Sequence, residues 1–529
     1  MFDTITRDLS LLAGRWGVTV DLQWSDRPDM ADVTTTMALR ASKSQGRAPK
    51  VLAQEACDLL IAKGYAAHIA GPGFINIKLT SEALVEAYHT RQWPSLEPKR
   101  VVLDYGGPNV AKPMHVGHLR SLLLGESLKR ILTTCGQTVI SDIHWGDWGL
   151  QMGMLIVGVQ QSGKDPADLR FDDFASLYPM VSHAAKTDPA FKLAAQKATT
   201  ALQGGAVEET AIWKRLVTLT KTQIIPEIAR LGVSFHHWKG ESDVSGLLST
   251  YTNAHLANGV AVVSDGAVVI PVEGDVPLIL RNSEGSYLYG ATDLCTIVNR
   301  LACDGPDEII YVVDQRQALH FKQVFESAAK TLPPVKLTHV GFGTVNGPDG
   351  RPLKTRDGGT PKLGDLISDA FGLALERNPD PMVAERVAMA ALKFADLSTH
   401  RLTNYQFDLE RFVSFEGRTG PYMCYQFVRM INLLSTESWC ADDIEIMTDD
   451  ERLVIITLIK YREAVEGAGQ NFSPNLIADY AYALAQAFSV MYANGPIRGS
   501  PSRVALANEV KDHLGRCLYL LGIDPPAKM

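Results

Sequence analysis

The stretch that decides the fold is DYGGPNVAKPMHVGHLRS, residues 104–121. The residues before it, RVVLDY at 100–105, have the apolar character of a buried strand, and residues 119–132 carry leucines and isoleucines at helical spacing. Gly106-Gly107 lets the backbone turn tightly and lets a ligand approach closely. A strand, a glycine turn and a helix in this order predict an open α/β sheet, which binds ligands beyond the carboxyl ends of its strands.

Two histidines at the predicted helix start indicate an anion site. His115, Gly117 and His118 fall where a helix has free N–H groups and the positive end of its dipole. Lys112 adds a cationic donor for phosphate oxygens. A His-x-x-His pair can also consist of capping or core residues, but the strand–glycine–helix context favours a phosphate site.

The surrounding region, 98–375, alternates short apolar runs with helical stretches, which is typical of a parallel sheet covered by helices. TVISDIHWG at 138–146 is the next predicted strand. DEIIYVVD at 307–314 has the unbroken apolar run of a strand buried on both faces. Residues 160–260 look less regular, and we expect an insertion there. The predicted fold class of this region is α/β.

The two flanking regions differ in pattern from the central one. Residues 1–97 predict a small α+β unit, with a helix after Pro49 and a hairpin over AAHIAGPGFINIKL at 66–79. Residues 376–529 look wholly helical. One of their helices is expected inside 473–495, between Ser-Pro and Asn-Gly.

Composition excludes several classes of protein. The chain has 529 residues, of which 46% are hydrophobic and 21% charged, as in globular proteins in general. No apolar run is long enough to cross a membrane, and no secretory signal is evident at the N-terminus, so we expect a cytoplasmic protein. Seven cysteines without a C-x-x-C pair argue against a disulfide framework and a cysteine zinc site, and no metal site is predicted.

The net charge of −8 taken alone favours a small-molecule enzyme over a nucleic-acid-binding module. It leaves nucleic-acid binding open, because a local basic surface can hold a polyanion while the rest of the protein is acidic.

Three motifs carry a resemblance to a known family. PNVAKPMHVGHLRS at 108–121 resembles the HIGH-type signature of class I aminoacyl-tRNA synthetases, in the form found in arginyl-tRNA synthetases. WGDWGLQMGML at 145–155 is similar to the motif that follows it in that family, and GRPLKTRDGG at 350–359 is similar to the KTR-x-GG form of its KMSKS-type loop. The similarity continues almost to both ends of the chain.

The resemblance implies an architecture of three parts. A Rossmann-like class I catalytic domain would cover 98–375. A small N-terminal α+β domain, associated with the tRNA elbow, would cover 1–97. A C-terminal all-α anticodon-binding bundle would cover 376–529.

The resemblance also implies roles for single residues. The catalytic residues are His115, His118, Lys112 and Lys354. The ATP-binding residues are Gly117, His320, Thr355 and Arg356. The arginine-binding residues are Asp104, Asn109, Glu241, Tyr289, Asp293 and Gln317. Carboxylates suit this task, because a guanidinium is planar, always charged and rich in donors.

The implied activity is ATP-dependent ligation of L-arginine to tRNA(Arg) through arginyl-adenylate, with attachment at the 2′-OH of the terminal adenosine. The implied cofactors are ATP and substrate-bound Mg²⁺. Members of the family typically require tRNA even for activation of the amino acid, and a cytoplasmic monomer that serves protein biosynthesis is expected.

The chain departs from the family pattern at two places, and two other functions stay open. Gly106-Gly107 stands where serines are common, and Gly290-Ala291 stands where hydroxyl residues are frequent. One alternative is a tRNA-independent amino-acid adenylating ligase, which would not need the helical region 376–529. The other is a catalytically silent paralogue that binds tRNA, and the retained histidines argue against it.

Overall fold

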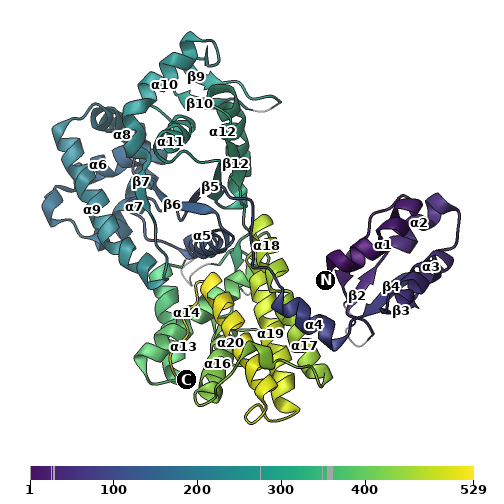
Figure 1. The fold of residues 1–529 in the computed structure, drawn as a ribbon. Coiled ribbons are helices and arrows are strands. Elements are labelled where there is room, and N and C mark those ends of the chain that lie inside the picture. The colour runs from purple at the N-terminus through teal and green to yellow at the C-terminus, as the bar shows by residue number, and fades with distance from the viewer. Residues whose placement is uncertain (1, 26, 28–29, 275, 348, 354–360) are drawn as a thin grey trace. The chain divides into compact units, whose positions relative to one another are not determined.

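The computed structural model describes residues 2–25, 27, 30–274, 276–347, 349–353 and 361–529 (Figure 1). The chain forms two compact units. The larger unit comprises residues 94–428, 465–479 and 517–529, and the smaller unit comprises 1–93, 429–464 and 480–516. Each unit is described by itself.

The larger unit is built on a five-stranded parallel sheet with the order β12-β11-β5-β6-β7. Its strands are β5 (Arg100–Tyr105), β6 (Thr138–Trp145), β7 (His237–Gly240), β11 (Glu308–Val312) and β12 (Lys336–His339). The predicted α/β fold and the strands at 100–105, 138–146 and 307–314 are confirmed. β11 lies between β5 and β12 and is buried throughout, as its apolar run predicts.

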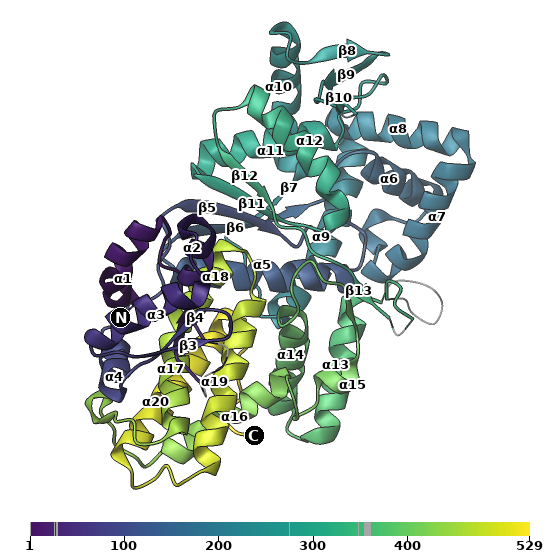
Figure 2. The same cartoon turned by 90° about the vertical axis from the view of Figure 1, so that its right-hand side faces the viewer.

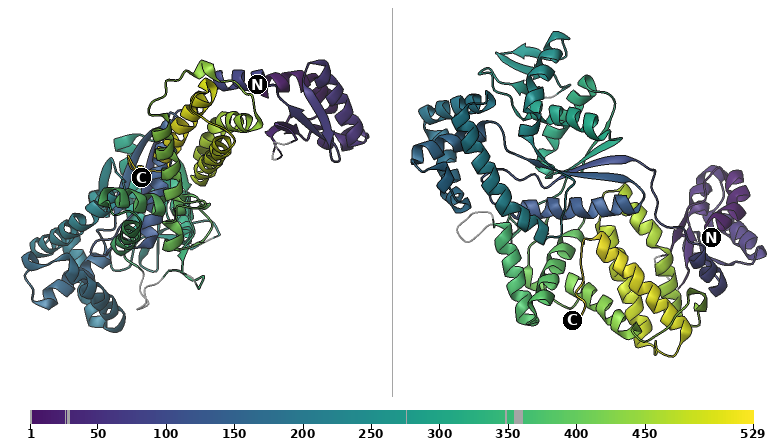
Figure 3. Two further views of the ribbon diagram at one scale, coloured as in Figure 1. Left: turned by 90° about the horizontal axis from the view of Figure 1, so that it is seen from below. Right: turned by 60° about the vertical axis from the view of Figure 1, so that its left-hand side comes forward.

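Helices cover both faces of this sheet. α5 (Val116–Thr134) lies along one face (Figure 3), and α11 (Tyr289–Asp304) and α12 (Ala318–Thr331) lie on the other (Figure 2). Side chains alternate between the faces along each strand. Asp104 at the end of β5 therefore contacts Arg300 of α11 at 2.6 Å, while the next residue, Tyr105, packs against Gly125 of α5.

Residues 160–260 are more regular than the sequence suggested. They belong mostly to α6 (Leu150–Ser162), α7 (Phe174–Thr187), α8 (Pro189–Gln203), α9 (Val207–Arg230) and α10 (Ser245–Ala257). The apolar residues of the first four helices pack on one another in a separate core that includes Leu155, Phe174 and Leu216. Three antiparallel strands follow, and the sequence had not indicated them: β8 (Val262–Ser264), β9 (Ala267–Ile270) and β10 (Leu278–Arg281).

The rest of the larger unit is mainly helical. It contains α13 (Leu363–Arg377), α14 (Pro381–Leu397) and α15 (Leu409–Phe412). The prediction that 376–529 is wholly helical is wrong at one point, because β14 (Tyr405–Gln406) pairs in parallel with β13 (Val345–Asn346). This short strand is held in place by its side chain, since the Tyr405 hydroxyl bonds the buried Asp396 at 2.9 Å.

The smaller unit combines an antiparallel sheet with helices from both parts of the sequence. The sheet has the order β1-β2-β4-β3. Its strands are β1 (Leu22–Trp24), β2 (Val33–Thr35), β3 (Ala66–Ala70) and β4 (Phe74–Lys78). The helices of the N-terminal segment are α1 (Phe2–Trp16), α2 (Met37–Gln45), α3 (Pro49–Ala62) and α4 (Ser81–His89). The predicted α+β unit, the helix after Pro49 and the β3–β4 hairpin are confirmed.

Later helices complete this unit. α17 (Asp449–Ile459) lies wholly in it, and α16 (Gly420–Leu434), α18 (Tyr461–Gln470), α19 (Asn475–Ala493) and α20 (Pro501–Leu520) have residues in both units. α19 is the helix predicted inside 473–495. Within the unit, Arg452 of α17 pairs with the buried Asp32 and donates to the carbonyl oxygen of Leu79 at 2.6 Å. Among the described residues, no helix has the length and apolarity to span a bilayer.

The contact between α5 and β5 can be tested at Gly125. A Cβ atom there would lie 2.1 Å from Cγ of Tyr105, so Gly125→Ala must displace the tyrosine. We expect the substitution to lower the free energy of unfolding by about 1–3 kcal/mol. Gly372→Ala in α13 is the control, because its Cβ meets nothing within 4 Å, and it should stabilise by about 0.5–1 kcal/mol. Unfolding midpoints measure both, and equal stability of Gly125→Ala and wild type would disprove the contact.

Candidate active site

The two histidines form the start of α5. His115 is the N-cap residue, and its Nδ1 accepts the N–H of Gly117 at 3.1 Å. Nδ1 of His118 accepts the N–H of His115, also at 3.1 Å. Because both Nδ1 atoms accept backbone protons, a neutral imidazole at either position carries its proton on Nε2. The histidines therefore cap the helix and still keep one ring donor each.

Burial keeps these histidines neutral. It lowers the pKa of His118 to about 3, with the neighbouring His115 as the second cause. Burial, followed by the charge of Lys112, also lowers the pKa of His115. Both rings are consequently neutral hydrogen-bond donors near pH 7, which can bind phosphate oxygens without adding full charges.

A cavity of about 280 Å³ opens in front of them. Its polar lining comprises Asp104, Asn109, His115, His118, Ser121, Asp314, Arg316 and Gln317, with the backbone of Gly106, Gly107 and Gly117. The cavity lies beyond the carboxyl ends of β5 and β11, where open α/β sheets bind ligands. Its size and donors suit a small anionic ligand.

The turn that lines this cavity requires glycine. Gly106 and Gly107 have φ angles of +94° and +46°, in the left-handed region. A Cβ at Gly106 would also lie 3.0 Å from Leu122 of α5. Glycine at these two positions, where serines are common in the family, therefore fits the left-handed backbone conformation of the turn.

Three carboxylates gather beside the cavity. Glu241 follows β7 directly, Asp147 follows β6 by two residues, and Asp293 is the fifth residue of α11. Asp147 accepts hydrogen bonds from the N–H and the hydroxyl of Ser242 at 2.9 and 2.7 Å, which fixes the backbone next to Glu241. These residues are called the carboxylate cluster below.

The carboxylate cluster is set up for a cation. Burial, then the charges of Asp293 and Asp147, raises the pKa of Glu241 to about 9. In the part of the chain that the structure describes, no Lys or Arg forms an ion pair with Glu241. Asp293 is bonded by His320, whose Nε2 lies 2.6 Å from Oδ2, and this bond raises the pKa of His320. A bound guanidinium would supply the cationic partner that Glu241 lacks among the described residues.

Tyr289 lies close to the carboxylate cluster, whereas Asp104 lines the phosphate cavity. Tyr289 begins α11, on the same helical face as Asp293, and is 57% exposed. Burial around its hydroxyl, with Glu241 as the next cause, raises the pKa of Tyr289 to about 12. Asp104 already has a partner, because Arg300 bonds one of its oxygens at 2.6 Å and Asp142 at 2.7 Å.

Of the described residues predicted for ATP binding and catalysis, two lie away from the phosphate cavity. Lys112 does not line it, and its Nζ sits 4.4 Å from the ring centre of Tyr178, in a second cleft of about 570 Å³. Its charge still acts on both histidines. His320 lies with Asp293 instead of among the cavity residues. Lys354, Thr355 and Arg356 fall outside the described residues.

Sequence reasoning missed three functional candidates. Arg316 lines the cavity, and Asp314 holds it through two bonds of 2.7 and 2.9 Å. Its signal was a basic residue just after the predicted strand 307–314. Arg300 and Asp147 are buried and polar. Asp147 lies in the motif at 145–155 but was given no role, and no local pattern marks Arg300 as buried. The cavity lining includes Asp104, Asn109 and Gln317, predicted for arginine, together with His115, Gly117 and His118, predicted for ATP and catalysis.

The chain resembles known proteins over nearly its whole length. Residues 80–409 match the model for the catalytic domain of class I tRNA synthetases (R), residues 3–79 the arginyl tRNA synthetase N-terminal domain, and residues 423–529 the DALR anticodon binding domain. An arginine–tRNA ligase of Hyphomonas neptunium is 39% identical, covering 98% of this chain and 97% of the relative. One from Maricaulis maris is 40% identical, covering 95% and 94%.

Solved structures have the same fold. Arginyl-tRNA synthetase of Plasmodium falciparum superposes with a TM-score of 0.82 at 22% identity, covering 99% of this chain and 98% of that one. The Thermus thermophilus enzyme gives 0.79 at 24% identity, with 100% and 99% covered.

The parallel sheet, the histidine-capped helix and the matched model define the catalytic domain of a class I aminoacyl-tRNA synthetase. The match of residues 3–79 and the similarity to arginine–tRNA ligases over nearly the whole chain identify the family within this class. The chain belongs to the arginyl-tRNA synthetase family.

The raised pKa of Glu241 predicts a pH dependence of arginine binding. Glu241, with a pKa of about 9 in the empty pocket, is protonated near neutral pH, and a bound guanidinium favours its ionised form. Arginine affinity should therefore rise with pH, by up to about tenfold per unit between about pH 6 and 8, and level off above about 9. The amino group of arginine stays protonated over most of this interval. Calorimetry in buffers of different ionisation enthalpy should detect proton release, and binding without it would contradict this assignment.

Proposed function

We propose that this chain ligates L-arginine to tRNA(Arg), using ATP and passing through arginyl-adenylate. The observation that carries the proposal is the position of the carboxylate cluster next to a cavity lined by neutral histidines, at one edge of one sheet. The cluster suits a guanidinium, and the cavity suits the phosphates of ATP. Their proximity suits a reaction between the carboxylate of arginine and the α-phosphate.

In the first step, the arginine carboxylate attacks the α-phosphate in line and expels pyrophosphate. Nε2–H of His115 and His118 would donate to the phosphate oxygens as their charge shifts, beside the positive end of the α5 dipole. Arg316 adds a positive charge at the cavity. We assign Gly117 to close approach of ATP, and Lys112, Lys354, Thr355 and Arg356 to the same nucleotide. Mg²⁺ would enter with ATP and offset phosphate charge.

Arginine would be oriented from both of its ends. Glu241 and Asp293 would receive the guanidinium, with His320 holding Asp293 and Tyr289 packing along the alkyl stem. Asp104, Asn109 and Gln317 would receive the amino-acid end. Asn109 is well fixed for this, because its backbone forms a bridge with Gly146 after β6. Holding both ends leaves the carboxylate as the free nucleophile and supplies acceleration through orientation.

In the second step, the 2′-hydroxyl of the terminal adenosine of the tRNA attacks the carbonyl of the adenylate. Residues 1–97 would contact the tRNA elbow, 98–375 would form the catalytic domain, and 376–529 would bind the anticodon. We infer that activation requires bound tRNA and that the protein acts as a cytoplasmic monomer.

ATP–pyrophosphate exchange with each amino acid, with and without tRNA, tests this function. Exchange with arginine only in the presence of tRNA is expected. Exchange with arginine in the absence of tRNA would favour the tRNA-independent adenylating ligase. Absence of exchange from folded protein that still binds tRNA would favour the silent paralogue.

The role of Glu241 has its own test. Glu241→Gln keeps the shape and removes the charge, so the KM for arginine should rise by about a hundredfold, as for loss of a charged hydrogen bond of about 3 kcal/mol. Glu308→Gln is the matched control, because Glu308 is equally buried, at 5% against 8%, but begins β11 at the opposite edge of the sheet. Its KM for arginine should match wild type. An unchanged KM in Glu241→Gln would remove this residue from the pocket.

A further inference from the structure

The last turn of α20 ends on α5. A helix leaves its final carbonyl groups without partners in the helix. Gly522, with φ +68°, closes part of this end, since its N–H bonds the carbonyl of Tyr519 at 2.9 Å and the N–H of Ile523 bonds that of Leu518 at 2.8 Å. The carbonyls of Leu520 and Gly522 still need donors.

Side chains of α5 and α14 supply these donors. The Ser127 hydroxyl donates to the carbonyl of Leu520 at 2.8 Å, and the buried Lys393 donates to that of Gly522. Arg130 donates from Nη1 to the carbonyl of Tyr519 at 3.0 Å, and its guanidinium lies 4.9 Å from the centre of the Tyr519 ring. Cations at the carboxyl end of a helix also meet the negative end of its dipole.

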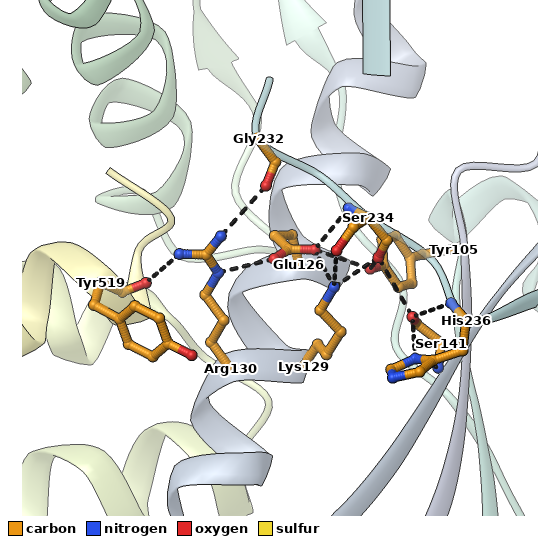
Figure 4. A network of polar contacts seen from close by, with 9 residues as sticks. All are labelled: Tyr105, Glu126, Lys129, Arg130, Ser141, Gly232, Ser234, His236 and Tyr519. Atoms are coloured by element: carbon orange, nitrogen blue, oxygen red, sulfur yellow. Dashed lines mark hydrogen bonds and ion pairs between the residues drawn. The ribbon is translucent and has the colours of Figure 1, made fainter. Parts of the chain in front are cut away.

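Arg130 continues this contact into the sheet (Figure 4). Its Nε donates to Glu126 at 2.8 Å, and the other oxygen of Glu126 lies 3.2 Å from the hydroxyl of Tyr105. Lys129 also bonds this carboxylate, at 2.6 Å. Glu126 is only 4% exposed, so its charge is held by these partners and by the N–H of Ser234 at 3.3 Å.

Tyr105 directly precedes the Gly106-Gly107 turn, called the phosphate loop here, and also lines the cavity. It ends β5, follows Asp104 and precedes the Gly106-Gly107 turn that lines the phosphate cavity. Its side chain packs closely on Gly125, where an added Cβ would lie 2.1 Å from Cγ of Tyr105. A displacement of Glu126 would therefore shift Tyr105, and with it the backbone of the adjoining Gly106-Gly107 turn.

We propose that Arg130 is a positioning residue for ATP, which links the C-terminal segment 517–523 to the phosphate loop through Glu126 and Tyr105. Burying the carboxylate of Glu126 costs free energy, and an apolar side chain could fill the same space. Buried polar networks such as this one are useful where a single arrangement of the surrounding residues must be specified. Arg130 lies about 18 Å along α5 from His118, too far to touch ATP. The inference rests on the proposed function.

The carboxylate cluster supplies the discriminating prediction. Glu241 and Asp293 are carried by the end of β7 and by α11, and neither belongs to α5. Arg130→Met should therefore raise the KM for ATP about five- to tenfold and the KM for arginine by a clearly smaller factor, because only Asp104 and Asn109 of the proposed arginine contacts lie beside this turn. Exchange with tRNA present measures both KM values. Arg130→Lys, which keeps a positive charge beside Glu126, should restore part of the affinity for ATP that Arg130→Met loses.

Arg386→Met is the matched control. Arg386 of α14 also holds the C-terminal segment, through Asp524 at 2.7 Å and the carbonyl of Pro525 at 2.9 Å, but among the described residues it forms no bond with Glu126 or Tyr105. Its KM for ATP should equal that of wild type. Tyr105→Phe should raise the KM for ATP, and the double variant with Arg130→Met should be no worse than Arg130→Met alone, because both break one chain of contacts.

A purely structural role gives a different pattern. Arg130→Met would then lower the unfolding temperature and the fraction of active sites, with both KM values unchanged and with effects that add to those of Tyr105→Phe. That result, or an equal rise in both KM values, would overturn the inference. If wild type shows no exchange, the proposed function fails, and the dissociation constant of ATP, measured directly for each variant, still tests Arg130.

Discussion

The arrangement of the larger unit depends on one buried cation. Arg300 is 1% exposed and lies between Asp104 of β5 and Asp142 of β6. Burial disfavours all three charges and the two carboxylates repel each other, so both depend on the guanidinium of Arg300 between them. The triad ties α11 to the centre of the sheet and thereby fixes Asp293, two turns earlier on the same helix, relative to the phosphate turn after β5. The distance between the two halves of the proposed reaction is set by this contact.

The sequence allowed the layers and the phosphate end of the site to be predicted, because both follow local rules. A glycine turn between a strand and a helix places His115 and His118 at a helix start whatever the rest of the chain does, and the apolar run 307–314 has only one stable environment. The carboxylate cluster could be expected only through the family resemblance, since its members come from three separate elements. Asp147 and Arg300 escaped notice for the same reason: their burial is a property of the packed structure. The short strand at Tyr405 depends on a tertiary pair with Val345, which no local pattern encodes.

The site combines two opposite electrostatic strategies. At the phosphate end, burial removes charge from two histidines, so that neutral donors and the helix N-terminus face an anion. At the other end, burial crowds carboxylates until Glu241 retains its proton. Like charges repel within the carboxylate cluster, and a cationic ligand would relieve that repulsion. The neutral donors at the other end would suit an anionic ligand. A ligand without a guanidinium would leave the carboxylates unpaired, which gives selectivity by the penalty on wrong ligands.

The pairing of Arg452 with Asp32 has a consequence for how the protein is made. The two residues are 420 positions apart, and the smaller unit contains residues from 1–93 together with residues from 429–464 and 480–516. During synthesis the N-terminal segment emerges first, and Asp32 has no cationic partner from α17 until most of the chain has left the ribosome. The α+β segment must therefore persist on its own sheet and helices for the time needed to add several hundred residues. The smaller unit is therefore completed late in synthesis, at about the time when α20, whose last turn contacts α5, is added.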